Sequence, residues 1–162
     1  MAEGALLLAV ITLQRILELG LSARNTRRLL QRGAVEIAPG HYPLIVALHT
    51  AWLGVLWVVG WNLEVSGVWL TAYLALQLFR LWILASLGQR WTTRIIVFDE
   101  PLVRRGPYRF LRHPNYLLVV LEIAVVPLAL GLPWLAVIFS LLNAGVLLVR
   151  IRAEDRALAA FR

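Results

Sequence analysis

Hydrophobic positions along the chain gather into five long runs, and the polar residues are concentrated between them. The runs cover about residues 4–21, 42–61, 68–87, 115–130 and 133–149. A transmembrane helix needs roughly 20 mainly apolar residues, and the fourth run, which has Pro127 near its end, is shorter than that. Within lipid a helix satisfies its own backbone groups, whereas an open sheet does not. The pattern therefore predicts an all-α, polytopic membrane protein with five transmembrane helices.

The arginines indicate how these helices are oriented. All 16 basic residues are Arg, and fourteen of them fall between runs one and two, between runs three and four, or after run five. The two other connections, residues 62–67 and 131–132, contain none. Under the positive-inside rule this distribution predicts an N-terminus outside and a C-terminus in the cytoplasm. Because topology and anionic lipid account for the charge, we expect membrane lipids as partners and no nucleic acid.

Composition supports the same class of protein. The chain has 162 residues, of which 60% are hydrophobic and 15% charged, whereas soluble proteins have about 45–50% and about 25%. This length predicts a single domain, residues 1–162. The absence of cysteine excludes disulfides and thiolate metal sites. His41 and His49 have no third ligand at suitable spacing, so we expect no metal.

Four ionisable residues fall inside the predicted spans, where burial is costly and side chains usually face the protein interior. Arg15 and Glu18 are three residues apart and can pair on one helix face. Arg80 can extend toward the interface or meet Glu122 inside the bundle. Two interpretations of Glu122 remain open: it joins helices through polar contacts, or it lines a cofactor or acceptor pocket.

The loop before the fourth run contains the clearest motif, GPYRFLRHPNY at residues 106–116. Pro114 suits the first turn of a helix, and free N–H groups at a helix start can bind an anion such as a carboxylate. Arg109 and Arg112 add positive charge, and His113 can titrate near neutral pH. The arginines alone would be enough to orient the protein in the membrane. The Gly, Pro, Tyr and His residues of the motif are not needed for that, so they favour a functional loop.

This motif resembles the signature of the isoprenylcysteine carboxyl methyltransferase family of integral membrane enzymes. Residues 152–158, RAEDRAL, resemble the family's Glu-Glu-x-x-Leu stretch, with Asp155 in place of the second Glu. The resemblance covers about residues 87–158 and implies S-adenosylmethionine as the cofactor, held by the last two helices and their cytoplasmic flanks. The residues expected to bind the cofactor are Tyr108, Arg112, His113, Pro114, Asn115, Tyr116, Glu122 and Glu154.

The resemblance further implies methyl transfer to a carboxylate or hydroxyl oxygen of a lipophilic acceptor, either isoprenylcysteine-like or a phenolic or polyketide lipid. The expected catalytic residues are Glu154, Arg150 and Arg152. An Arg would orient a carboxylate acceptor, and Glu154 or His113 could serve as the base for a hydroxyl acceptor. The short chain resembles bacterial members, so we expect a bacterial cytoplasmic membrane, with the active site facing the cytoplasm.

Two alternatives stay open. Membrane sterol reductases have a similar C-terminal half, which would make the chain an NADPH-dependent reductase. The ionisable residues within the spans would also suit a non-catalytic scaffold or carrier. Competition between the two cofactors separates the first alternative from a methyltransferase. The second predicts that changing Arg80 or Glu122 matters more than changing the loop motif.

Overall fold

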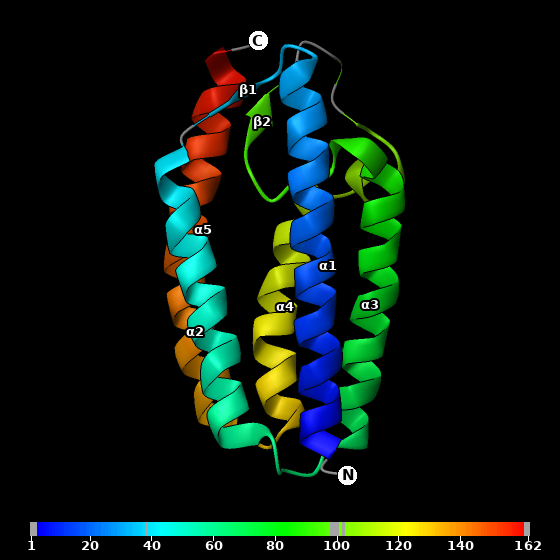
Figure 1. Cartoon of the computed structure of the whole chain (residues 1–162), viewed down its shortest axis with the longest axis vertical. Helices are drawn as coiled ribbons and strands as arrows, with labels where there is room; N and C mark the ends of the chain where they lie inside the picture. The colour runs from blue at the N-terminus through cyan, green and yellow to red at the C-terminus, as the bar shows by residue number, and fades with distance from the viewer. Residues whose placement is uncertain (1–2, 38, 98–100, 102, 161–162) are drawn as a thin grey trace.

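The protein is an elongated bundle of helices with nearly parallel axes (Figure 1). The structure, a computed structural model, describes residues 3–37, 39–97, 101 and 103–160. The α-helices in this part of the chain are α1 (Glu3–Gln31), α2 (Tyr42–Gly60), α3 (Gly67–Leu87), α4 (Pro114–Ala129) and α5 (Pro133–Ala160). The predicted helical membrane fold is therefore confirmed, with the two termini at opposite ends of the bundle (Figure 1).

Four helices, α1, α2, α3 and α5, are long and apolar enough to cross a membrane. The fourth in order, α4, has 16 residues, about 24 Å at 1.5 Å per residue, which is less than the roughly 30 Å hydrocarbon core of a bilayer. Pro127 lies in its last turn, and the positive φ of Gly131 (68°) turns the chain into α5. A fifth span and the orientation of the termini stay predictions.

Two helices continue well beyond the apolar runs that predicted them. The run at residues 4–21 belongs to a helix that ends at Gln31, and the run at 133–149 belongs to one that ends at Ala160. The added segments are rich in Arg, Ala and Leu, which are good helix formers. Hydropathy marks where the chain leaves lipid, whereas these propensities allow the helix to continue into water.

Short elements connect the helices at the end that holds the C-terminus. Strands β1 (Val35–Glu36) and β2 (Ile96–Val97) pair antiparallel there, and the connections contain 3-10 turns at Pro39–His41, Gly88–Arg90 and Gly106–Arg109. The ends of α1, α3 and α5 and the starts of α2 and α4 all point to this end (Figure 1). The arginine-rich segments of the sequence are thereby brought together.

A large cluster of buried apolar side chains fills the bundle toward the other end. Its fully buried side chains include Leu8, Trp52, Leu56, Ile123 and Val126. There α1 and α2 touch through glycines, because a Cβ on Gly4 would collide with the carbonyl oxygen of Gly60. Farther along the pair, Trp57 Nε1 on α2 donates a hydrogen bond to Thr12 Oγ1 on α1 at 2.9 Å.

Candidate functional site

Three residues of the sequence motifs form one cluster with Arg150 where α4 begins and α5 nears its end. The rings of His113 and Tyr116 stack, with centroids 5.0 Å apart and planes 8° from parallel. The Tyr116 hydroxyl donates a hydrogen bond to Glu154 Oε2 and accepts one from Arg150 Nε at 2.8 Å. His113 Nδ1 lies 3.7 Å from Glu154 Oε2. Two segments more than 30 residues apart in sequence are thus joined by hydrogen bonds to one hydroxyl.

The Gly-Pro-Tyr turn sets the position of this cluster against α3. Gly106 has a φ of 58°, and a Cβ there would collide with the side chain of Ser86, so only glycine fits. Arg105 Nε donates to the Ser86 carbonyl at 2.9 Å and holds the turn in place. The ring of Tyr108 packs beside the buried residues of α3 and α4. Burial, assisted by the negative charge of Glu154, raises the pKa of the Tyr108 phenol above its ordinary value.

The start of α4 differs from the anion site expected from the sequence. The N–H groups of Tyr116 and Leu117 both donate to the His113 carbonyl, at 3.1 and 3.2 Å. They are therefore not available to bind a carboxylate. The expectation of a free N–H group is wrong for Tyr116, which bonds to the carbonyl three residues before it, whereas the bond of Leu117 is the ordinary first bond of a helix.

The other expected site residues lie in different surroundings. Pro114 is buried at the first turn of α4, and Asn115 beside it lines a cavity in the bundle. Arg112 and Arg152 are exposed and are absent from that lining. Of the arginines expected near the reaction, only Arg150 is buried against the motif cluster.

Glu122 is held in a buried network of ion pairs between α1, α3 and α4. It is 1% exposed and accepts hydrogen bonds from Arg15 (2.5 Å), Gln77 (2.9 Å) and Arg80. Arg80 also donates to both oxygens of Glu18 at 2.7 Å, and the expected Arg15–Glu18 pair is present at 3.1 Å. Of the two routes open to Arg80, the structure shows the one to Glu122. Two positive and two negative groups make the network neutral.

A cavity of about 430 Å³ lies inside the bundle. All five helices line it, but α3 contributes only Arg80. Its lining is mainly apolar, and its polar members include Arg15, His49, Tyr116, Asn143 and Arg150. Tyr116 and Arg150 therefore belong both to the motif cluster and to the cavity wall. Sequence reasoning missed the α2 wall, because periodicity does not show how two helices are spaced or which of their residues enclose a cavity.

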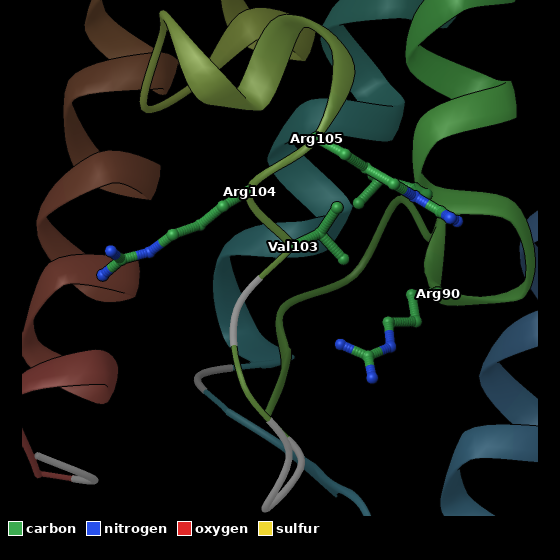
Figure 2. A pocket seen from close by; sticks show the side chains of 5 residues that line it. Arg90, Val103, Arg104 and Arg105 are labelled. Carbon is green, nitrogen blue, oxygen red and sulfur yellow. The ribbon is translucent and has the colours of Figure 1, made fainter.

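A second hollow, at the arginine-rich end, is lined by Leu87, Arg90, Val103, Arg104 and Arg105. Figure 2 shows Arg104 and Arg105 extending in opposite directions from the loop. Arg90 donates to the Pro101 carbonyl at 2.8 Å, and Arg105 is bonded to α3. These side chains do not converge on one point, so the hollow is not arranged as an anion clamp. Among the described residues, no group of three or more His, Asp or Glu could hold a metal ion.

Comparison with known proteins places the chain in a family. Residues 68–160, which include α3, α4, the loop and α5, match the model of the isoprenylcysteine carboxyl methyltransferase (ICMT) family. The uncharacterized protein YpbQ of Bacillus subtilis (strain 168) is 39% identical over 159 residues, which cover 94% of this chain and 95% of that protein. An uncharacterized protein of Haemophilus influenzae is 24% identical over 160 residues, with 93% and 92% covered.

No solved structure matches the chain. The family match extends over more than half of the residues, and the Bacillus relative aligns along nearly the whole length. The chain belongs to the isoprenylcysteine carboxyl methyltransferase family, whose members are membrane methyltransferases that generally use S-adenosylmethionine.

Proposed function

We propose that this protein transfers a methyl group from S-adenosylmethionine to an oxygen atom of a lipophilic acceptor that lies in the bundle cavity. One observation carries the proposal: Tyr116 and Arg150 form a wall shared by the motif cluster and the cavity. A donor held on one side of this wall would meet an acceptor held on the other. The basic segments at the same end favour a cytoplasmic donor site in a bacterial membrane.

The motif cluster suits a sulfonium donor. The carboxylate of Glu154 attracts a cation, and the Tyr116 ring already does so, with the Arg150 guanidinium 5.2 Å from its centroid. When bound, S-adenosylmethionine supplies a methyl group on positively charged sulfur, which needs no further activation. The protein's part is then alignment, which can lower a barrier by roughly 7–11 kcal/mol. Tyr108, with its raised pKa, borders this site as a neutral phenol.

Arg150 suits the acceptor side. Its Nε is fixed by the Tyr116 hydroxyl, and its remaining guanidinium N–H groups can orient an acceptor carboxylate in the cavity. For a hydroxyl acceptor, the proton must leave as the methyl group arrives. Glu154 and His113 are the groups close enough to the shared wall to receive that proton.

The cavity also offers an entrance for a lipid. Five of its lining residues are exposed on the outside of the bundle, namely Ile16 and Leu19 on α1 and Val46, Thr50 and Gly54 on α2. Their spacing of three or four residues places them on facing stripes of the two helices. A lipophilic acceptor would enter between α1 and α2 directly from the bilayer.

Calorimetry on the protein in lipid nanodiscs tests the donor site. We expect wild type to bind S-adenosylmethionine and Tyr116→Phe or Glu154→Gln to bind it at least tenfold more weakly, which corresponds to about 1.4 kcal/mol. The Arg27→Gln variant, at an exposed arginine of α1 that belongs to neither motif, is the control and should bind as wild type does. Absence of binding to wild type, or displacement of the donor by NADPH, would contradict the proposal.

A further inference from the structure

The cavity has polar groups at two depths. The motif level consists of Tyr116 and Arg150, and the deep level consists of Arg15, His49 and Asn143. Asn143 precedes Arg150 by seven residues on α5, so it lies two turns away on the same helix face. Glu122, which binds Arg15, follows Tyr116 by six residues on α4. Both helices place the deep level about 9–10 Å farther into the bundle.

The stretch of cavity between these levels is apolar on α4 and α5, whereas Glu18 lines it on α1. Its lining there includes Val119 on α4 and Val146 and Leu147 on α5. Beyond the deep level the lining is again mainly apolar, with Leu53, Gly54 and Trp57 of α2. A plain hydrocarbon chain would suit such a cavity if it were apolar throughout, so the polar groups of the deep level need a separate explanation.

Asn143 gives the clearest indication that a ligand is bound at this depth. The residue is 4% exposed, and within the described part of the chain its amide has no hydrogen-bond partner, although it lines the cavity. The amide is open to the cavity rather than sealed in protein, because the fully enclosed side-chain atoms without a partner are Thr26 Oγ1 and Trp52 Nε1. A ligand in the cavity can therefore hydrogen-bond to it.

Arg15 has hydrogen-bonding capacity to spare at the same depth. Its side chain is 23% exposed, against 5% for Arg80, which uses all three nitrogens on Glu18 and Glu122. Arg15 donates through its two terminal nitrogens, one to each carboxylate, and a guanidinium has five N–H groups. Because the network is neutral, Arg15 is suited to a neutral oxygen rather than to an anion.

His49 complements Arg15 with an acceptor. Its Nδ1 lies 2.8 Å from the Ile45 carbonyl, so in the neutral ring Nδ1 carries the proton and Nε2 presents a lone pair. Arg15 lies close enough to His49 to influence it electrostatically. Arg15 donates, His49 accepts and Asn143 does both, which together suit a hydroxyl group.

We propose that the acceptor carries a second oxygen function, a hydroxyl group, about 9–10 Å from the oxygen that is methylated. The deep level recognises this hydroxyl and selects oxygenated lipids over plain alkyl or isoprenoid chains. The inference rests on the proposed function for the identity of the reacting end, whereas recognition of the hydroxyl rests on the deep level alone.

Binding of three fatty acids to the protein in nanodiscs tests the proposal. One acid carries a hydroxyl about 10 Å along the chain from its carboxylate, one carries it near the far end, and one carries none. Displacement of the radiolabelled first acid measures each affinity. We expect the first acid to bind about tenfold more tightly than the others, the effect of one good buried hydrogen bond.

Variants of the deep-level residues test whether the preference for the hydroxylated acid arises there. Asn143→Leu and His49→Leu should each reduce it to about twofold or less while leaving the binding of the plain acid unchanged. Thr71→Val is the control, because it removes a hydroxyl that bonds only within α3 at an exposed site. The control should keep the full preference.

Two outcomes separate this inference from the proposed function. Equal affinity of wild type for the three acids, with donor binding and methyl transfer intact, would overturn the inference alone. A clear preference for the first acid in a protein that neither binds S-adenosylmethionine nor transfers its methyl group would support the deep level and overturn the proposed function.

Discussion

Removing Glu122 should destabilise the bundle through charge imbalance. In the Glu122→Leu variant, Arg15 and Arg80 face a single carboxylate, Glu18. An uncompensated buried charge costs about 3–5 kcal/mol in soluble proteins, whereas hydrogen bonds between membrane helices average about 0.6 kcal/mol. The charge imbalance should therefore dominate. We expect a loss of about 3–5 kcal/mol, which for a chain of this size lowers the Tm by on the order of 10 °C.

The double variant Glu122→Leu/Arg80→Leu tests the reason for that loss. It leaves Arg15 and Glu18 as a neutral pair on α1, so it should recover most of the stability lost in the single variant. Thermal unfolding in nanodiscs, measured as a double-mutant cycle, gives the coupling energy. A double variant less stable than Glu122→Leu would refute the charge-balance reasoning. Normal binding of S-adenosylmethionine by the double variant is also expected, and its loss would instead favour Glu122 as a cofactor ligand.

Three further predictions concern glycines and one tyrosine. In a series of acceptors of increasing chain length, Gly54→Leu should shorten the longest acceptor that is methylated. Gly54 lines the cavity, and within the described structure a Cβ there would meet nothing within 4 Å, so the new side chain takes up cavity space. Gly20→Leu is the control, because Gly20 is equally unobstructed but does not line the cavity, and it should leave the limit unchanged. Gly106→Ala should lower the Tm more than Gly33→Ala, since both have positive φ but only Gly106 would also collide with α3. Because burial raises the pKa of Tyr108, the contribution of this phenol to stability should be complete below about pH 10 and decline above it. The Tm of Tyr108→Phe should therefore fall less between about pH 9 and 11 than the Tm of wild type does. Equal falls would contradict a raised pKa of Tyr108.

Much of the site was predictable because its residues lie in short motifs. Tyr116 and Glu154 were both expected at the cofactor site, and the structure places them in hydrogen-bond contact. The pairing of Arg15 with Glu18 followed from a spacing of three residues and is confirmed. Local spacing determines such contacts almost by itself, since it fixes which side chains share a helix face.

The cavity and its deep level were not predictable from the sequence. Periodicity shows which face of α2 is apolar, but the distance between α1 and α2 depends on where they touch, at Gly4 and Gly60. In the sequence, Asn143 is an ordinary polar residue of an apolar helix. Only the structure shows that it lines the cavity and that, within the described residues, its amide lacks a partner. The length of α1 was also underestimated, because apolar content ends before helix propensity does.

Transfer of a labelled methyl group from S-adenosylmethionine to membrane lipid, measured together with donor binding, tests the shared wall most directly. Val46→Trp should narrow the entrance between α1 and α2 and abolish transfer while donor binding stays normal. Glu154→Gln should weaken both donor binding and transfer. If Val46→Trp transferred the label as wild type does, or if Glu154→Gln bound the donor normally, the placement of donor and acceptor on opposite sides of Tyr116 and Arg150 would be contradicted.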